Sequence, residues 1–515
     1  MSYRPPVAEE RTTEERRARA DALRRRLGLL LAPLAFVALL LAPIGLDPPA
    51  HRLAAIVALA VILWVSEAIP LAATALLAPS LAVVMGVAPA KEALAPIASP
   101  LIFLFLGGFM IARGLQTQGM DRRAALWLLS RDFIGGRPGR VLIALAVAGF
   151  IGSMWISNTA TAAMLLPVAL GLVAAIDAFV PSGEDRLHES VRRYGSGMVL
   201  ALAYACSLGG MATPIGTAPN VIALDLLDRQ AGIHLDFFEW MSFALPVALT
   251  CLVGLLLWIR VRYPPPIERI EGLTAAVERQ LRELGPLTSG EARSLVVFAL
   301  AVLGWLAPSL IGLALGAEHP TSLWARSSLN EGIVAVLAAS LLFIIPSGEA
   351  DGEPVLPWSE AVRIDWGTLY LLGGGLALGK LMFDTGLAAA LADGALTLAG
   401  PIADSPLGLL ALATLLMTYL TEIASNTATT SMMIPVLLAI STKLQIDPLP
   451  MILCVTMAAS NAFMLPVSTP PNAIVYGSGH IRLGEMLRTG FVLDLLGFFV
   501  ILACGALLLP LLGLG

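Results

Sequence analysis

The chain has 515 residues, of which 57% are hydrophobic and only 13% are charged, and its formal net charge is −5. A soluble globular protein carries about 25% charged residues, so this composition and a mean hydropathy of +0.83 exclude that class and indicate a polytopic membrane protein. The four cysteines lie in apolar runs without a CxxC or metal-ligand spacing, which indicates core residues instead of a metal site.

The expected elements fall into two similar halves joined by a linker. A strongly charged cytoplasmic segment at 1–27, expected to be an amphipathic helix, precedes an extra leading helix at 28–51. The first half, 52–262, is expected to hold scaffold helices at 52–118, a hairpin at 141–180, a broken helix at 196–228 and a helix at 238–262. A cytoplasmic linker at 263–293 leads to the second half, 294–515, with scaffold helices at 294–398, a hairpin at 405–442, a broken helix at 449–478 and a helix at 488–513.

A duplicated motif supports this division. SNTAT occurs at 157–161, and SNTATTSMMIPV at 425–436 shares its Ser, Asn, Thr, Ala, Met, Pro and Val at identical offsets with the first copy. Each copy is followed by a segment that proline interrupts, GTAPN at 216–220 and STPPN at 468–472. Repeats of this kind are typical of secondary transporters, where the interrupted helices form the binding site.

The distribution of basic residues predicts the topology. Placing the arginine-rich segments inside gives a cytoplasmic N-terminus, an external C-terminus and about eleven spans of roughly 20 residues plus two re-entrant hairpins. The hairpins would then enter from opposite sides. Two ordinary spans in place of a hairpin would keep the same sidedness, but the interrupted composition favours the hairpins.

The two SNT tips have the chemistry of a cation site. Their side chains suit a helix start, where they accept hydrogen bonds from free N–H groups, and the positive end of each helix would face the tip. Ser153 and Thr421 place a hydroxyl one turn before each tip. Such residues can also serve only packing, but two matched tips, each followed by a proline break that frees carbonyls, favour a sodium site.

The tips lack basic residues. No Lys or Arg occurs at 141–185, 196–228, 381–442 or 444–481. An anion bound there would depend on helix N-termini and on bound cations for its countercharge, so cation coupling would be necessary for an anion. A neutral solute remains possible on these grounds alone. Glu422, next to Thr421, could tune the second cation site or carry a proton.

The motifs also resemble a known family. The paired SNTAT tips, WVSEAIPL at 64–71, and the GTAPN and LPVSTPPNAIV breaks resemble the divalent-anion/sodium symporter family from about residue 50 onward. The resemblance implies a homodimer in which a scaffold domain and a mobile transport domain work as an elevator. One departure from the family pattern is Ala218, where many relatives have proline.

The resemblance also implies the site residues. Carried over by motif, the first Na⁺ site comprises Ser153, Ser157, Asn158 and Gly216, and the second comprises Thr421, Ala424, Asn426 and Ser468. The resemblance further implies that the substrate carboxylates are bound by Asn158, Thr159, Asn426 and Thr427, with Thr217 and Pro470 lining the pocket.

The predicted function is therefore transport across the inner (plasma) membrane and not catalysis. We expect an all-α transporter that couples two or more Na⁺ ions to uptake of a small di- or tricarboxylate of the succinate, malate or citrate class, with lipid and a second copy as its partners and no nucleic acid. Within the family, a sodium-independent exchanger or a sulfate transporter is the alternative. An intramembrane serine enzyme would need a base, and the tips offer no His or Lys. An open channel fits poorly with two opposed hairpins.

Overall fold

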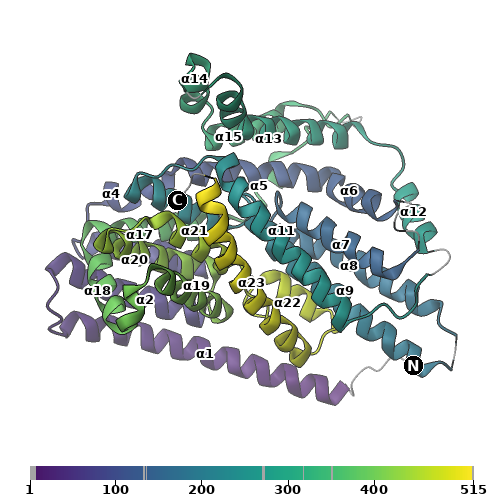
Figure 1. Cartoon of the computed structure of the whole chain (residues 1–515), viewed down its shortest axis with the longest axis horizontal. Helices are drawn as coiled ribbons and strands as arrows, with labels where there is room; N and C mark the ends of the chain where they lie inside the picture. The colour runs from purple at the N-terminus through teal and green to yellow at the C-terminus, as the bar shows by residue number, and fades with distance from the viewer. Residues whose placement is uncertain are drawn as a thin grey trace.

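The computed structural model describes residues 7–131, 134, 136–181, 183–269, 273–316, 318–348 and 352–512, and this part of the chain is built from helices (Figure 1). A single isolated β-bridge, between Pro346 and Pro354, is the only extended pairing in these ranges. The fold is therefore all-α, as the composition predicted. Residues 1–6 of the N-terminal segment, 270–272 of the linker and the end of the second half at 513–515 lie outside the described residues.

The N-terminal part differs from the expected division at residue 27. One continuous helix, α1 (Val7–Leu41), includes both the charged segment and most of the leading helix. Gly28 lies at this point, but a single glycine costs a helix only about 1 kcal/mol relative to alanine, so the helix continues through the change in polarity. α1 packs along α2 (Pro48–Ser66), which packs in turn on α3 (Leu71–Val84). The short helices α4 (Ala90–Leu94) and η1 (Ala95–Ala98) lead into α5 (Pro100–Gln118).

The first hairpin and the first break follow. An unpredicted short helix, α6 (Met120–Leu129), precedes the hairpin of α7 (Pro138–Ser153) and α8 (Asn158–Ala178). The broken helix consists of α9 (Asp185–Met211) and α10 (Ala218–Leu226), with a π-helical turn, η2 (Leu227–Ala231), at its end. α11 (Phe237–Arg262) closes this half.

The second half repeats this order after additional helices. The linker contains α12 (Leu273–Glu283), and α13 (Ser289–Leu315), α14 (Pro320–Ser328) and α15 (Glu331–Ile344) follow. After α16 (Trp358–Ala361) come α17 (Trp366–Asp384), α18 (Leu387–Ala399) and η3 (Gly400–Asp404). The second hairpin is α19 (Pro406–Ile423) with α20 (Asn426–Leu444), the second broken helix is α21 (Pro448–Ala459) with α22 (Pro470–Gly477), and the last helix is α23 (Leu483–Leu511).

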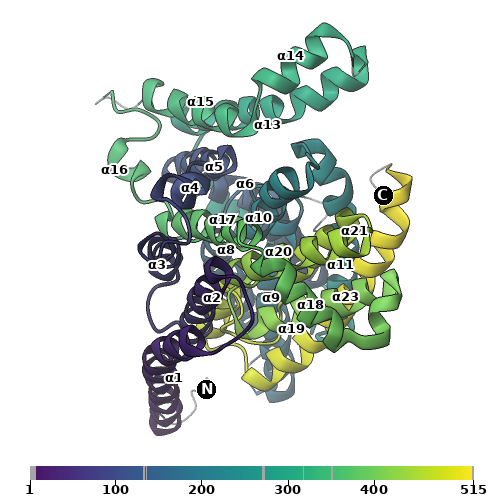
Figure 2. The same cartoon turned by 90° about the vertical axis from the view of Figure 1, so that its left-hand side faces the viewer.

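The helices form a body with two flanking layers. α13 and α15 lie along one side next to α5, with α14 projecting beyond them, and α1 lies along the opposite side (Figures 1 and 2). Both hairpins and both broken helices lie between these layers, and α11 packs beside α23. Among the described residues, nine helices are long and apolar enough to cross a membrane, or ten if the bent pair α14–α15 counts as one span. The predicted count of spans is not decided by length and composition, and it stays a prediction.

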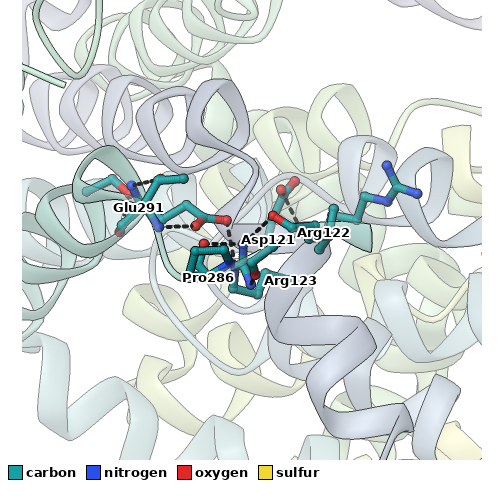
Figure 3. A network of polar contacts seen from close by, with 9 residues as sticks. Asp121, Arg122, Arg123, Pro286 and Glu291 are labelled. Carbon is teal, nitrogen blue, oxygen red and sulfur yellow. Dashed lines mark hydrogen bonds and ion pairs between the residues drawn. The ribbon is translucent and has the colours of Figure 1, made fainter. Parts of the chain in front are cut away.

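An ion pair anchors the linker to the first half. Arg123 of α6 contacts Glu291 near the start of α13 (Nε–Oε1 2.6 Å), and its guanidinium also donates to the carbonyls of Leu284, Gly285 and Pro286 (Figure 3). Glu291 accepts in addition the backbone N–H of Thr288, whose hydroxyl accepts the N–H of Glu291, and this capping box begins α13. The side chains of Arg123 and Glu291 are 13% and 5% exposed.

Because this pair is largely buried, we expect Arg123→Gln to destabilise the protein in detergent. Removing one partner of a buried pair costs about 3–5 kcal/mol when burial is complete, so the unfolding temperature should fall by several degrees. Arg122→Gln is the matched control, since Arg122 is exposed and its side chain points away from Glu291 (Figure 3). Equal unfolding temperatures for the two variants would contradict the anchoring role of Arg123.

Candidate functional site

The first SNT tip lies at the junction of α7 and α8. Ser153, the last residue of α7, is fully buried and donates from Oγ to Oδ1 of Asn158, at 2.5 Å. Ser157 is the N-cap of α8, and its hydroxyl accepts the N–H of Ala160 at 3.3 Å. The sequence-based expectation that this serine begins the helix is therefore correct. Two side-chain oxygens of the predicted first cation set thus lie in direct contact.

The first break lies directly against this tip. A Cβ atom added to Gly210 would lie 2.5 Å from Asn158 Oδ1, and one added to Gly216 would lie 2.4 Å from the carbonyl oxygen of Gly210. Because only glycine permits such close approach, Gly216, Gly210 and Asn158 form one compact group. Thr213 Oγ1 also donates to the carbonyl of Met154 at 2.5 Å, which ties the break to the end of α7. The structure therefore brings Ser153, Asn158 and Gly216 close together.

The second tip has the same arrangement. Thr421 is fully buried, and its Oγ1 lies 2.6 Å from Asn426 Oδ1 and 2.8 Å from the carbonyl oxygen of Ala459. Ala424 is extended (φ −136°, ψ 160°) and joins the two hairpin helices. Ser425 occupies the N-cap position of α20 but makes no side-chain cap hydrogen bond, unlike Ser157. The expectation that both serines cap their helices thus holds for the first tip alone.

An asparagine stabilises each break. Asn220 is fully buried, and its Nδ2 donates to the carbonyls of Gly210 (2.9 Å) and Thr213 (2.8 Å). Asn472, at the equivalent position, donates from Nδ2 to the carbonyls of Ala462 and Leu465, both at 3.1 Å. The amide of Asn220 thus binds carbonyls at the end of α9 and just beyond it, and the amide of Asn472 binds two carbonyls of the segment between α21 and α22. Their Oδ1 atoms are buried and receive no hydrogen bond from the described residues.

The two halves interlock around the tips. α8, which begins at the first tip, packs against α22 beyond the second break, and α20, which begins at the second tip, packs against α10 beyond the first break. Each hairpin therefore contacts its own break at the tip and the other half's broken helix along its length. This packing fixes the two tips within one block of helices.

The predicted substrate residues differ in their exposure. Thr159 and Pro470 are exposed, Asn158, Thr217 and Asn426 are half-buried, and Thr427 is buried. The tip hydrogen bonds come from hydroxyl, amide and backbone groups, and none of the ion pairs between described residues includes a tip residue. Hydroxyl, amide and carbonyl oxygens form the hard donor set that an alkali cation accepts, so the residues present fit Na⁺ as a transported ion.

Several residues at the site were not singled out from the sequence. Asp494 of α23 is fully buried and accepts the N–H of Phe463 in the second break, and Asp225 of α10 is buried and bonded to Ser99 and Arg229. Both acids lie in apolar runs, where an ionisable residue is a functional hypothesis, and this signal could have found them. Lys380 and Asp384, four residues apart on α17, form an ion pair with each other.

Comparisons with known proteins show which proteins this chain is similar to. The family model described as the sodium:sulfate symporter transmembrane region matches residues 22–514. The sodium-dependent dicarboxylate transporter SdcS of Staphylococcus saprophyticus is 34% identical over 94% of this chain and 91% of its own. SdcS of Staphylococcus aureus strain USA300 is 32% identical over 92% of this chain and 89% of its own. The crystal structure of the Alcanivorax borkumensis YdaH transporter is similar in fold, with a TM-score of 0.51 at 13% identity, over 81% of this chain and 87% of that one.

Proposed function

This chain belongs to the sodium:sulfate symporter family, and from that premise we propose that it couples Na⁺ entry to the uptake of a small di- or tricarboxylate across the plasma membrane. The family membership predicted from the SNT motifs is thereby confirmed, and the protein is a transporter and not an enzyme. The observation that carries the proposal is the pair of matched tips, each with a hydroxyl and an amide oxygen in contact and no basic residue in the sequence around it.

Charge balance supports coupling to at least two sodium ions. Moving one charge against 100 mV costs about 2.3 kcal/mol, so a dianion that enters a negative interior opposes about 4.6 kcal/mol. Two Na⁺ ions cancel this electrical cost, and their concentration gradient then drives uptake. The two tips supply one Na⁺ site each, the first with Ser153, Ser157, Asn158 and Gly216 and the second with Thr421, Ala424, Asn426 and Ser468.

The proposed mechanism is an elevator. The hairpins and broken helices form the moving unit, the tips enter the membrane from opposite sides, and the scaffold helices hold two copies together as a homodimer. Substrate carboxylates bind at Asn158, Thr159, Asn426 and Thr427, with Thr217 and Pro470 beside them. The exposure of Thr159 and Pro470 supports this assignment, since both are accessible to a solute.

Reconstituted protein tests this proposal. We expect uptake of labelled succinate, malate or citrate into proteoliposomes to require an inward Na⁺ gradient and to fail when choline replaces Na⁺. Sulfate and α-ketoglutarate serve as competing substrates. Exchange that continues without Na⁺ would contradict coupling and indicate an exchanger, and flux that does not saturate would indicate a channel.

The threonines of the tips should matter for the substrate more than for Na⁺. We expect Thr159→Ala and Thr427→Ala to raise the substrate KM roughly tenfold, because each removes one hydrogen bond to a charged group, worth about 1.5–3 kcal/mol. The Na⁺ concentration for half-maximal uptake should change less than the KM. The measurement is initial uptake at varied substrate and Na⁺. A Na⁺ effect larger than the substrate effect would reverse the assignment.

A further inference from the structure

The second break is held by two acidic side chains that the first break lacks. Glu422 of α19 is 1% exposed and accepts two consecutive backbone N–H groups, those of Met464 at 2.8 Å and Leu465 at 3.0 Å. Asp494 of α23 accepts the N–H before them, from Phe463, at 3.2 Å. Three successive N–H groups of the segment between α21 and α22 thus point at two carboxyl groups.

α23 is shaped to receive this segment. Gly490 and Gly497 lie on the same face as Asp494, because residues four and three apart share a helix face. A Cβ atom on Gly490 would lie 2.3 Å from the carbonyl oxygen of Phe463, and one on Gly497 would lie 2.2 Å from Asn461 Oδ1. Tyr204 of α9 donates to the same Phe463 carbonyl at 2.8 Å. The segment therefore has little freedom to move while α23 and Glu422 stay in place.

Both acids lie beside the proposed second cation site. Glu422 follows Thr421 directly, and its carboxyl group accepts the N–H of Leu465, whose carbonyl accepts the hydroxyl of Ser468 at 2.5 Å. Asp494 Oδ2 is buried and receives no hydrogen bond from the described residues. Both carboxyl groups are buried and accept successive N–H groups of one short segment, so a cation at the second site would stabilise negative charge on them. The two acids thus hold the segment 463–465 in one position and place negative charge next to the proposed second cation site.

The first half has no counterpart. Aligning Thr421 with Ser153 places Met154 at the position of Glu422. In the first half the break donates a side-chain hydroxyl, that of Thr213, to a backbone carbonyl of the hairpin, that of Met154. In the second half the break donates backbone N–H groups to a side chain of the hairpin, that of Glu422. The two halves therefore share the oxygen donors at their tips but differ in charge at their breaks.

We propose that Glu422 and Asp494 are positioning residues that set the cation affinity of the second site and make it electrically distinct from the first. By orienting the segment 463–465, they aim the carbonyls and the Ser468 hydroxyl at the site and add negative charge next to it. This inference rests on the proposed function, because it concerns one of its two Na⁺ sites.

The test compares Glu422→Gln and Asp494→Asn with wild type and with Asp404→Asn, a matched loss of charge at an exposed residue of the same half. We expect the Na⁺ concentration for half-maximal uptake to rise about tenfold in the first two variants, while the substrate KM at saturating Na⁺ stays within about twofold. Thermal stabilisation of the purified protein by NaCl over choline chloride, measured without substrate, should need correspondingly more Na⁺. Glu422→Asp should restore part of the affinity.

The outcomes separate the two proposals. Wild-type protein without Na⁺-dependent uptake or stabilisation would overturn the proposed function. A Na⁺-dependent wild type whose variants lose rate or stability at an unchanged half-maximal Na⁺ would overturn this inference and leave the two acids a structural role alone. If Glu422→Gln does not reach the membrane, Asp494→Asn decides the question, because its amide oxygen still accepts the N–H of Phe463 while its charge is lost.

Discussion

Alanine at Asn158 or Asn426 is expected to abolish uptake while leaving the protein inserted in the membrane. Each asparagine is the first residue of a hairpin helix, α8 or α20. Its side-chain oxygen lies within 2.6 Å of the hydroxyl of Ser153 or Thr421. In the proposed site each side chain contacts both a cation and the substrate, and hydrogen bonds to charged groups are worth about 1.5–3 kcal/mol. Losing two such contacts should lower uptake roughly 100-fold or more.

The matched control is Asn330→Ala, because Asn330 caps α15 in the flanking layer, at a helix start unrelated to the tips. This variant should retain Na⁺-coupled uptake. Expression, monodispersity in detergent and initial uptake rates are measured for all three variants. Normal kinetics in Asn158→Ala and Asn426→Ala would show that the tips do not form the site.

The positions of the hairpins and breaks could be predicted because polar residues and prolines interrupt the apolar runs there. Serine, asparagine and threonine interrupt apolar runs at the tips, and Pro219 and Pro471 mark the restart of the broken helices. α7 and α8 accordingly lie within 138–178, and α19 and α20 within 406–444. Local sequence suffices here, since each break is specified by residues next to it.

Other features depend on contacts between distant segments, which periodicity cannot supply. α6 and α14 are short and carry charged or polar residues, so no apolar run indicates them. α1 continues past residue 27 because the single Gly28 is not enough to end a helix. The pairing of Asp494 with Phe463 joins α23 to the second break. Asp494 itself is visible in the sequence as an acid in an apolar run, but its partner is not.

Asn220 and Asn472 hold the backbone of the two breaks by hydrogen bonds, a role that composition alone did not assign. We expect Asn220→Ala and Asn472→Ala to reduce both uptake and stability. Each side chain donates to two or more carbonyls in or next to its break, and an unsatisfied buried polar group costs about 1–3 kcal/mol. Without the amide, the carbonyls would no longer be held in one arrangement, and the cation site beside Gly216 or Ser468 should lose Na⁺ affinity together with rigidity.

This combination distinguishes the break asparagines from the tip asparagines, whose loss should remove uptake at nearly unchanged stability. Asn220→Asp and Asn472→Asp keep the side-chain shape but replace the N–H donors by an acceptor that faces carbonyls, so they should be at least as damaging as alanine. Unfolding temperatures in Na⁺ and in choline, together with uptake at varied Na⁺, separate these effects. Aspartate variants with wild-type stability would show that shape, and not the donated hydrogen bonds, maintains the breaks.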